Sequence, residues 1–330
     1  MSHLKGLAVL TFCTSLILGG CSILNSTEEE QDYEFVDGKN GAKEIKISEK
    51  EQERLKKVGE AYREENYVPV QEYIGEGFTL EPDNGTDAVA ESHRDEVEQA
   101  VEKFFKKNYK TGIKVHNIVG TTDAASVFVE SVGEPHFYTL AIIPVDVKNE
   151  TVDTYGVWSL EGEIEMSIIT GLLAMINDER FAILDEYLEK IVKENPVTVQ
   201  RIEALENVGA DKHATPYYRL NASLGSFQSL LDAYLENPNR TVEEWKTLAK
   251  AVSYDPERFS VAIDLFMLGE DSKPDEELID KISLDIEEMK GLPRAKYGIY
   301  LHDNFVDKTS GRGEKENSLR RGNPKLIIKE

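Results

Sequence analysis

The sequence has very little cysteine and no apolar run long enough to cross a membrane. Its two cysteines are Cys13, inside an apolar segment at residues 7–18, and Cys21, just after that segment. The rest of the chain therefore has no residue for a disulfide, a thiol nucleophile or a cysteine-based metal site. The apolar segment is shorter than the roughly 20 residues that span a bilayer, and it has the length of a signal-peptide core.

The apolar segment ends in the tetrapeptide Leu18-Gly19-Gly20-Cys21. This tetrapeptide resembles the bacterial lipobox, in which the cysteine thiol receives a diacylglyceryl group before a peptidase cuts ahead of it. We therefore expect residues 1–20 to be a removed signal peptide and Cys21 to carry lipid, palmitate included. Two or three acyl chains hold a protein firmly. Membrane lipid is thus the first expected partner, on the outer face of the cytoplasmic membrane.

Positive charge is scarce. The chain has 38 Lys and Arg against 62 Asp and Glu, which gives a net charge of −24 at pH 7. Residues 1–20 contain one lysine and no carboxylate, so their removal leaves 37 minus 62, or −25. So acidic a surface repels nucleic acid, which we exclude as a partner, and attracts cations or basic cell-wall components. An exported chain without disulfides also favours a Gram-positive envelope.

Sequence motifs for chemistry are missing as well. The chain has no Gly-rich phosphate loop, no His-Glu-x-x-His and no Gly-x-Ser-x-Gly elbow. Its Asp-Gly and Asn-Gly segments lack the alternating acids of an EF-hand and indicate turns. We therefore predict no catalytic residue, no cofactor and no metal site, although single histidines can still converge in space. The histidines after the signal peptide lie singly along the chain: His93, His116, His136, His213 and His302.

The first half of the chain indicates an α+β domain behind a linker. Residues 21–47 are rich in charged and turn-forming residues, which predicts a flexible acidic tether. The domain is expected over residues 48–195, beginning with a charged helix to about residue 65 and a second helix over 92–109. A four-stranded antiparallel meander follows, because β-branched and aromatic residues fill four segments. These segments are 113–120, 125–132, 136–147 and 151–158.

The second half indicates a helical region with a strand–helix–strand unit over residues 196–305. Residues 205–223 lack a clear period. Residues 306–330 carry seven Lys or Arg against four acids, and we predict a disordered basic tail there. The strand–helix–strand unit is predicted from the periods of three segments, 259–268, 275–289 and 296–302.

Two groups of polar residues are candidate binding sites, and turn or strand-end roles are the alternative for both. The first group lies at a predicted hairpin, where binding residues are often found; it consists of Glu134, His136 and Tyr138. The second group follows the last predicted strand, since the ends of parallel strands often hold ligands; it consists of His302, Asp303 and Asn304.

The chain also resembles a family of uncharacterised lipoproteins of Gram-positive bacteria, a conserved domain of unknown function in bacilli and staphylococci. The resemblance covers residues 68–318. It implies a lipid-anchored surface protein, and it brings no assigned reaction, ligand or catalytic residue. The segments that carry it are Val115-His116-Asn117, the run from Val127 to Tyr138, Val157-Trp158-Ser159, Asn207-Val208-Gly209, Thr215-Pro216-Tyr217-Tyr218, Leu292-Pro293 and Asp307-Lys308.

These observations favour a membrane-anchored, non-enzymatic protein that binds an envelope protein or a cell-wall partner. Two alternatives remain open. One is a cell-envelope hydrolase or small-ligand enzyme, which requires a cleft where carboxylates or histidines with shifted pKa values converge. The other is the solute-binding component of a transporter, which requires two α/β lobes at a hinge, and the predicted meander disfavours it.

Overall fold

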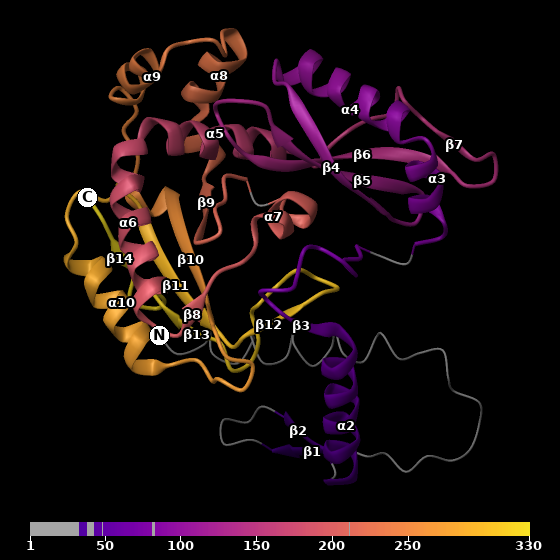
Figure 1. Cartoon of the computed structure of the whole chain (residues 1–330), viewed down its shortest axis with the longest axis vertical. Coiled ribbons are helices and arrows are strands. Elements are labelled where there is room, and N and C mark those ends of the chain that lie inside the picture. The colour runs from indigo at the N-terminus through magenta and orange to yellow at the C-terminus, as the bar shows by residue number, and fades with distance from the viewer. Residues whose placement is uncertain (1–32, 38–42, 48, 81–82, 211) are drawn as a thin grey trace. The chain divides into compact units, whose positions relative to one another are not determined.

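A computed structural model shows the arrangement of the elements (Figure 1). The chain forms two compact units, one up to Tyr62 and one from Arg63 to Glu330. The described residues are 33–37, 43–47, 49–80, 83–210 and 212–330. No helix among them is long and apolar enough to cross a membrane. The predicted signal peptide lies outside the described residues, together with Leu18, Gly19, Gly20 and Cys21.

The N-terminal unit contains a small sheet where we expected a flexible tether. β1 (Tyr33–Asp37) pairs in antiparallel fashion with β2 (Lys43–Ile47), and Phe35 lies opposite Ile45. Apolar residues at alternate positions of both segments favour such pairing. The high charge of the surrounding sequence concealed this alternation.

Helix α2 (Glu49–Asn66) follows the small sheet. Its few apolar side chains are exposed, with Leu55 at 45% and Val58 at 57%. Ion pairs between residues one turn apart stabilise such a helix. One of them joins Lys57 to Glu53 over 3.1 Å. The predicted charged helix is therefore present and has little apolar packing of its own.

The first sheet of the larger unit is the predicted four-stranded antiparallel meander, which confirms the α+β class. Its fourth strand is shorter than expected, and a bridge between Ile142 and Trp158 continues the pairing beyond it. In spatial order the strands are β4 (Ile113–Gly120), β5 (Ala124–Ser131), β6 (Tyr138–Asp146) and β7 (Thr151–Val152).

Two helices, α3 (Thr86–Ser92) and α4 (Arg94–Tyr109), cover this sheet (Figure 1). On α4, Val97, Val101 and Phe105 have no exposed surface. Burial of such side chains stabilises the fold by about 1.5–3 kcal/mol each. These three residues recur every four positions in the sequence, which is helical spacing, and they form the face that packs on the sheet.

The second sheet is built around two parallel strands, β10 (Phe259–Met267) and β11 (Lys296–His302). The helix α10 (Glu276–Glu288) lies between them in the sequence, so the predicted strand–helix–strand unit is confirmed. Four shorter antiparallel strands complete the sheet: β8 (Val197–Thr198), β9 (Tyr218–Ala222), β13 (Leu319–Arg321) and β14 (Ile327–Ile328).

Residues 205–223, which lack a clear period, contain two further elements. They are the end of α7 (Ile202–Val208) and the strand β9, which pairs with β10. Buried and exposed side chains alternate along β9, which is the period of a half-buried strand. The irregular segment before β9 concealed this short pattern.

The C-terminal residues 306–330 are folded, so the prediction of a disordered tail is wrong. β12 (Phe305–Asp307) pairs with β3 (Tyr67–Pro69), and β13 and β14 pair with β11. The basic residues of this segment meet acids of α10. Arg321 lies 2.5 Å from Glu276 and 2.6 Å from Asp280. The local basic charge therefore complements the acidic body.

Residues 63–330 share one main hydrophobic core, which extends across the boundary at residue 195 that we expected between the α+β domain and the helical region. The helix α5 (Glu163–Ile176) contacts β6 of the first sheet and β9 of the second, and so joins the two sheets. The remaining helices are α6 (Asp178–Glu194), η1 (Leu224–Ser226), α8 (Gln228–Glu236), α9 (Val242–Ala249) and η2 (Pro256–Arg258).

Candidate functional site

An irregularity in the pairing of β4 with β5 builds the site. Val115 pairs with Val129 and Asn117 pairs with Phe128, so His116 is the additional residue of a β-bulge. A bulge re-aims the side chain at that position, and bulges are frequent beside functional sites. The His116 ring consequently reaches a carboxylate of the neighbouring strand.

That carboxylate belongs to Glu130 of β5 and is shared by two imidazoles. Nε2 of His116 lies 2.9 Å from Oε2 of Glu130, and Nε2 of His136 lies 2.8 Å from Oε1. An ionised carboxylate only accepts hydrogen bonds, so both rings donate. The side chains are 6% exposed for His116, 22% for Glu130 and 30% for His136. Solvent therefore reaches the group from the His136 side.

A second carboxylate comes from Glu206 on α7. Its Oε2 lies 3.9 Å from Nδ1 of His116. The side chain of Asn117 donates to the backbone carbonyl of Asn207 over 2.9 Å, which holds α7 against β4. Ligand atoms of His116, Glu130 and Glu206 all lie within 4.8 Å of one another. We call the resulting group the histidine–glutamate cluster: His116, Glu130, His136 and Glu206.

A third histidine supports the backbone that carries His136. Nδ1 of His213 donates to the carbonyl of His136 over 2.8 Å, and the two rings meet edge to face at 5.8 Å. The backbone N–H of His213 donates to Oγ1 of Thr170 on α5. A Cβ atom at Gly171 would lie 2.8 Å from the His136 carbonyl oxygen, so this glycine allows α5 to approach closely.

The surroundings shift several pKa values in the site. Burial raises the pKa of Glu130, but the hydrogen bonds from His136 and His116 outweigh it and hold the pKa below its usual range. Burial lowers the pKa of His213 to about 4. Burial, with the nearby Glu130 and Glu206 carboxylates, raises the pKa of Tyr138 to about 12. The glutamate is thus ionised and the supporting histidine neutral at pH 7.

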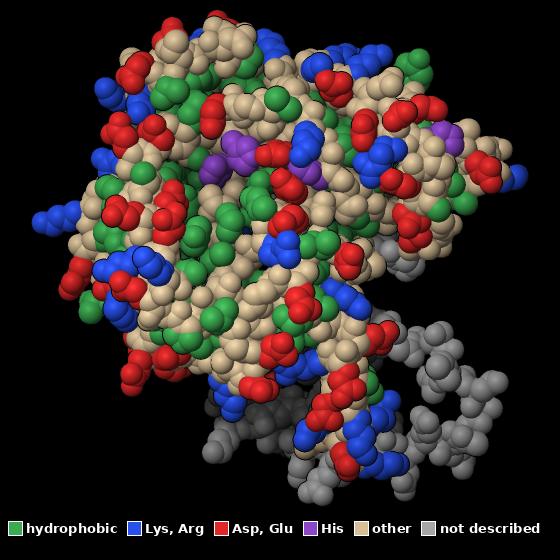
Figure 2. All heavy atoms as spheres, in the orientation of Figure 1, with side chains coloured by type: hydrophobic (Ala, Val, Ile, Leu, Met, Phe, Trp, Pro, Cys, Tyr) green, Lys and Arg blue, Asp and Glu red, His purple; other side chains and the backbone are tan. Residues whose placement is uncertain are grey.

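Three histidines that lie singly in the sequence, His116, His136 and His213, are therefore neighbours in the fold, which is the convergence that the sequence left open. Side chains able to hold a metal ion come together where we predicted none. Figure 2 shows histidine side chains gathered beside acidic ones on the face in view. Over the part of the chain that the structure describes, no Lys or Arg pairs with Glu130 or Glu206.

The three candidates at the predicted hairpin lie in different surroundings. His136 belongs to the histidine–glutamate cluster. The ring of Tyr138 packs edge to face against His136 at 5.1 Å and is buried. Glu134 is exposed, and its carboxylate accepts the backbone N–H of His136 over 3.1 Å. Only one of the three candidates therefore presents its functional group to the cluster.

Asp303, a candidate of the second predicted group, forms a buried ion pair. Its Oδ1 lies 2.7 Å from Nζ of Lys315, and both side chains are 7% exposed. Asn317 donates to Oδ2 over 2.9 Å. Burial raises the pKa of Asp303, but the hydrogen bonds from Lys315 and Asn317 outweigh it and lower the pKa. These contacts assign Asp303 a structural role.

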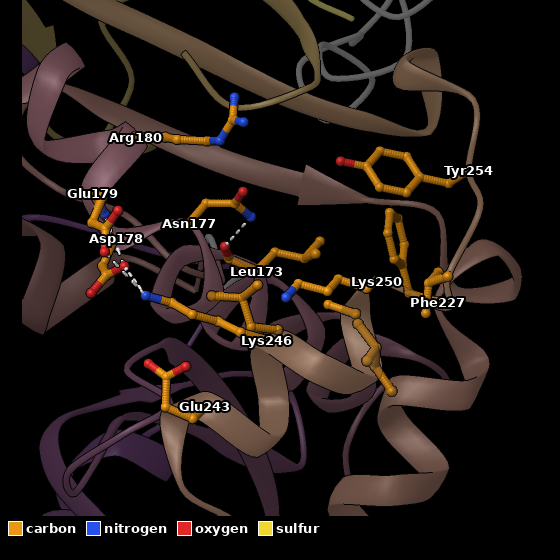
Figure 3. Close-up of a pocket in the computed structure, with 14 residues that line it drawn as sticks. Leu173, Asn177, Asp178, Glu179, Arg180, Phe227, Glu243, Lys246, Lys250 and Tyr254 are labelled. Atoms are coloured by element: carbon orange, nitrogen blue, oxygen red, sulfur yellow. Dashed lines mark hydrogen bonds and ion pairs between the residues drawn. The ribbon is translucent and has the colours of Figure 1, made fainter. Parts of the chain in front are cut away.

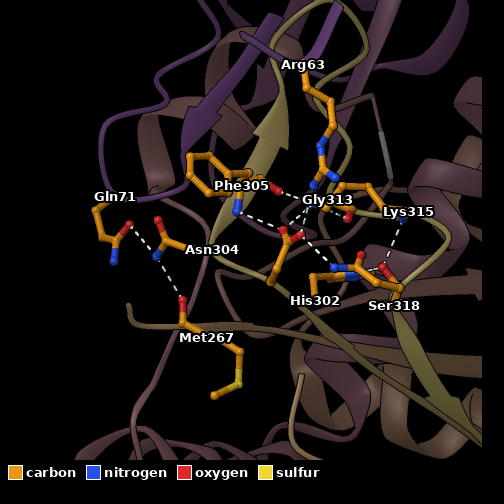
Figure 4. Close-up of polar contacts among 11 residues, drawn as sticks. Arg63, Gln71, Met267, His302, Asn304, Phe305, Gly313, Lys315 and Ser318 are labelled. Atoms are coloured by element: carbon orange, nitrogen blue, oxygen red, sulfur yellow. Dashed lines mark hydrogen bonds and ion pairs between the residues drawn. The ribbon is translucent and has the colours of Figure 1, made fainter. Parts of the chain in front are cut away.

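His302 and Asn304 are also occupied by internal contacts. Nδ1 of His302 lies 2.8 Å from the Ser318 hydroxyl, and the side-chain amide of Asn304 donates to the Met267 carbonyl over 2.8 Å (Figure 4). Both residues are buried. Within the described residues, no hydrogen bond or ion pair links them to the histidine–glutamate cluster.

A separate cavity of about 470 Å³ lies where the end of α5 and the start of α6 meet α8 and α9. Figure 3 shows Lys246 reaching across it toward Asp178 and Glu179. Nζ of Lys246 lies 3.0 Å from Asp178 and 3.6 Å from Glu179. The cavity therefore has mixed charges that neutralise one another, and they favour no one class of ligand.

Comparison with known proteins identifies the family. No curated protein is significantly similar to the chain in sequence. The fold is similar to a crystal structure of a DUF1672 family protein from Staphylococcus aureus, with a TM-score of 0.66 and 16% identity over 80% of this chain and 98% of that one. The model of the DUF1672 family, described as proteins of unknown function, matches residues 60–329. The expected resemblance is confirmed, and the chain belongs to the DUF1672 family.

Proposed function

We propose that this protein is lipid-anchored through Cys21 to the outer face of the cytoplasmic membrane in a Gram-positive envelope, and that it binds a ligand at the histidine–glutamate cluster. The tetrapeptide Leu18-Gly19-Gly20-Cys21 supports the anchor. The binding role is carried by one observation: a bulged strand, its neighbour, a loop and α7 bring four side chains to one partly buried point.

A binding role without catalysis is favoured by the partners of the two imidazoles. A catalytic nucleophile needs a base within hydrogen-bond distance. Among the described residues, no serine or threonine hydroxyl is hydrogen-bonded to His116 or His136, whose side-chain partners are carboxylates. The acidic surface, at a net charge of −24, further disfavours nucleic acid as the partner.

The anchor is tested by labelling cells with an alkyne-bearing palmitate while they express the full chain or its Cys21→Ala variant. The wild type should be labelled and recovered with membranes, because an acylated cysteine holds it there. The variant should lose both label and membrane recovery. Equal labelling of the two chains would contradict the proposed anchor.

The binding role is tested by thermal unfolding of the full-length chain with metals, sugars, peptides, nucleotides and cell-wall fragments. A ligand at about a hundred times its dissociation constant adds roughly 2.7 kcal/mol of stability. A ligand of this site should raise the wild-type midpoint and leave that of Glu130→Gln unchanged. If every ligand acts equally on both chains, the site has no binding role.

A second candidate function is a cell-envelope hydrolase. It is favoured by the convergence of carboxylates and imidazoles in which Glu130 and His213 both have lowered pKa values, as catalytic groups often do. Turnover of a cell-wall fragment that is lost in Glu206→Gln would favour this reading. A transporter component is less well supported, because the first sheet is wholly antiparallel and is no α/β lobe.

A further inference from the structure

We propose that the histidine–glutamate cluster binds one divalent transition-metal ion. The ligands are one imidazole nitrogen of His116 and one carboxylate oxygen each of Glu130 and Glu206. This inference rests on the proposed binding role of the same site and names the class of its ligand. One nitrogen and two oxygen donors suit Zn²⁺ and Mn²⁺, and the remaining coordination positions are open to water or to a group of a partner.

The spacing of the donor atoms is close to what such an ion needs. Ligand atoms of the three residues already lie within 4.8 Å of one another. Around a tetrahedral zinc ion, neighbouring ligand atoms are about 3.3 Å apart. Nε2 of His116 and Oε2 of Glu130 are separated by 2.9 Å. Glu206 is 29% exposed on α7, so its side chain has room to rotate toward the other two ligands.

The ion takes the place of the hydrogen that joins His116 to Glu130. In the structure this hydrogen lies between a ring nitrogen and a carboxylate oxygen. A bound cation requires the nitrogen lone pair instead, so the ring releases a proton to solvent or carries its N–H on the other nitrogen. Both glutamates then contribute negative charge to the cation.

His136 occupies the position of a supporting residue around a metal site. It donates to Oε1 of Glu130, the oxygen that His116 does not use, and so fixes the orientation of the carboxylate. His213 and Thr170 hold the backbone of His136 in turn. No described Lys or Arg pairs with Glu130 or Glu206, so their charge is available to a cation.

The test uses the full-length chain in detergent, freed of metal with a chelator. Isothermal titration with Zn²⁺ and Mn²⁺ should show one site per chain, and Co²⁺ should give visible absorption bands that report an imidazole–carboxylate environment. Glu206→Gln and His116→Ala should weaken Zn²⁺ binding by more than about 100-fold, and His136→Ala by about 10–100-fold. Glu203→Gln, one turn earlier on α7 and outside the cluster, is the matched control and should bind as the wild type does.

Circular dichroism and thermal unfolding of each metal-free variant show whether it is folded. Glu206→Gln keeps the size of the side chain and guards against a folding defect in His116→Ala. Two results would overturn the metal proposal: a wild type that takes up no ion, or folded variants that bind Zn²⁺ as tightly as Glu203→Gln. The proposed binding role is judged separately from the metal. It holds if another ligand raises the unfolding midpoint of the wild type and leaves that of Glu130→Gln unchanged. The Cys21→Ala chain should bind metal normally, so the anchor is judged separately.

Discussion

The ammonium group of Lys315 lies 2.7 Å from the carboxylate of Asp303, and both side chains are 7% exposed. Lys315 belongs to the C-terminal segment, and Asp303 directly follows β11. The pair therefore fastens this segment to the end of a central strand. Lys315 also donates to the backbone carbonyls of Phe305 and Gly313, so its charge is surrounded by acceptors (Figure 4).

Removal of the lysine should be costly. Lys315→Met leaves the buried Asp303 carboxylate with only Arg63, which is 55% exposed and lies 3.4 Å away. Breaking a buried pair typically costs about 3–5 kcal/mol, and the remaining arginine places the expected loss at or below the lower end of that range. Urea unfolding at pH 7 measures this loss. Arg320→Met is the control, because Arg320 and Glu314 form an exposed pair at 57% and 54% exposure, and such pairs contribute about 0–1 kcal/mol. Equal effects of the two substitutions would contradict a buried pair.

The ion pair of Asp303 and Lys315 also predicts how stability changes at acidic pH. Because the folded-state pKa of Asp303 is lowered, its contribution is present above the usual aspartate pKa and is lost as the pH falls through the lowered value. The difference in free energy of unfolding between wild type and Lys315→Met should therefore shrink in acid. Urea titrations at neutral and acidic pH check this, and a constant difference would mean that Asp303 does not titrate with the pair.

The folded C-terminus is tested at two adjacent isoleucines of β14. Ile327 is 3% exposed and belongs to the main core, whereas Ile328 is 38% exposed. Ile327→Ala should lower the free energy of unfolding by about 2–5 kcal/mol. Ile328→Ala is the control, and it should change stability by about 0.5 kcal/mol or less. Two equally mild substitutions would agree with a disordered tail instead.

Gly171 tests the support of the site by α5. A Cβ atom there would press on the carbonyl of His136 and on Pro135, so Gly171→Ala should destabilise the chain by about 1–3 kcal/mol. At Gly225 no atom lies within 4 Å of the added Cβ, and Gly225→Ala should be neutral or slightly stabilising. Thermal unfolding compares the two. If Gly171→Ala leaves the unfolding midpoint unchanged, the loop that carries His136 moves away from α5 at little cost in free energy.

His213 should make stability depend on pH. Its pKa falls from 6.5 to about 4 in the folded chain, so the unfolded chain binds the proton more readily. The contribution is complete above pH 6.5 and is lost as the pH falls toward 4. His213→Asn keeps a donor for the His136 carbonyl but does not titrate. The wild type should lose up to about 3 kcal/mol more than this variant across the interval. Parallel pH profiles would contradict burial of a neutral ring.

Local patterns predicted much of the fold. The helical spacing of Val97, Val101 and Phe105 marked the inner face of α4, and the β-branched segments marked the meander. The strand–helix–strand unit was also predicted from the sequence. The short strand β9 and the C-terminal strands were not, because two to five residues give too little period and their pairing partner lies elsewhere in the chain.

The candidate site was only partly accessible to sequence reasoning. His136 was identified from its place at a hairpin, whereas His116, Glu130, Glu206 and His213 were missed. The antiparallel pairing of β4 with β5 offered one usable signal, since it brings His116 and Glu130 close across a short turn. The sequence around Glu206 has no pattern that predicts the packing of α7 beside His116 and Glu130.

By itself, the sequence determined the α+β class, the meander and the parallel unit, because these depend on residues a few positions apart. Only the tertiary structure decided that a bulge at His116 meets Glu130 and that α7 adds Glu206. It also decided that Lys315 is buried against Asp303 instead of lying in a solvated tail. The physical reason is shared: bulges, docking angles and buried ion pairs arise from contacts between segments, and no local period encodes them.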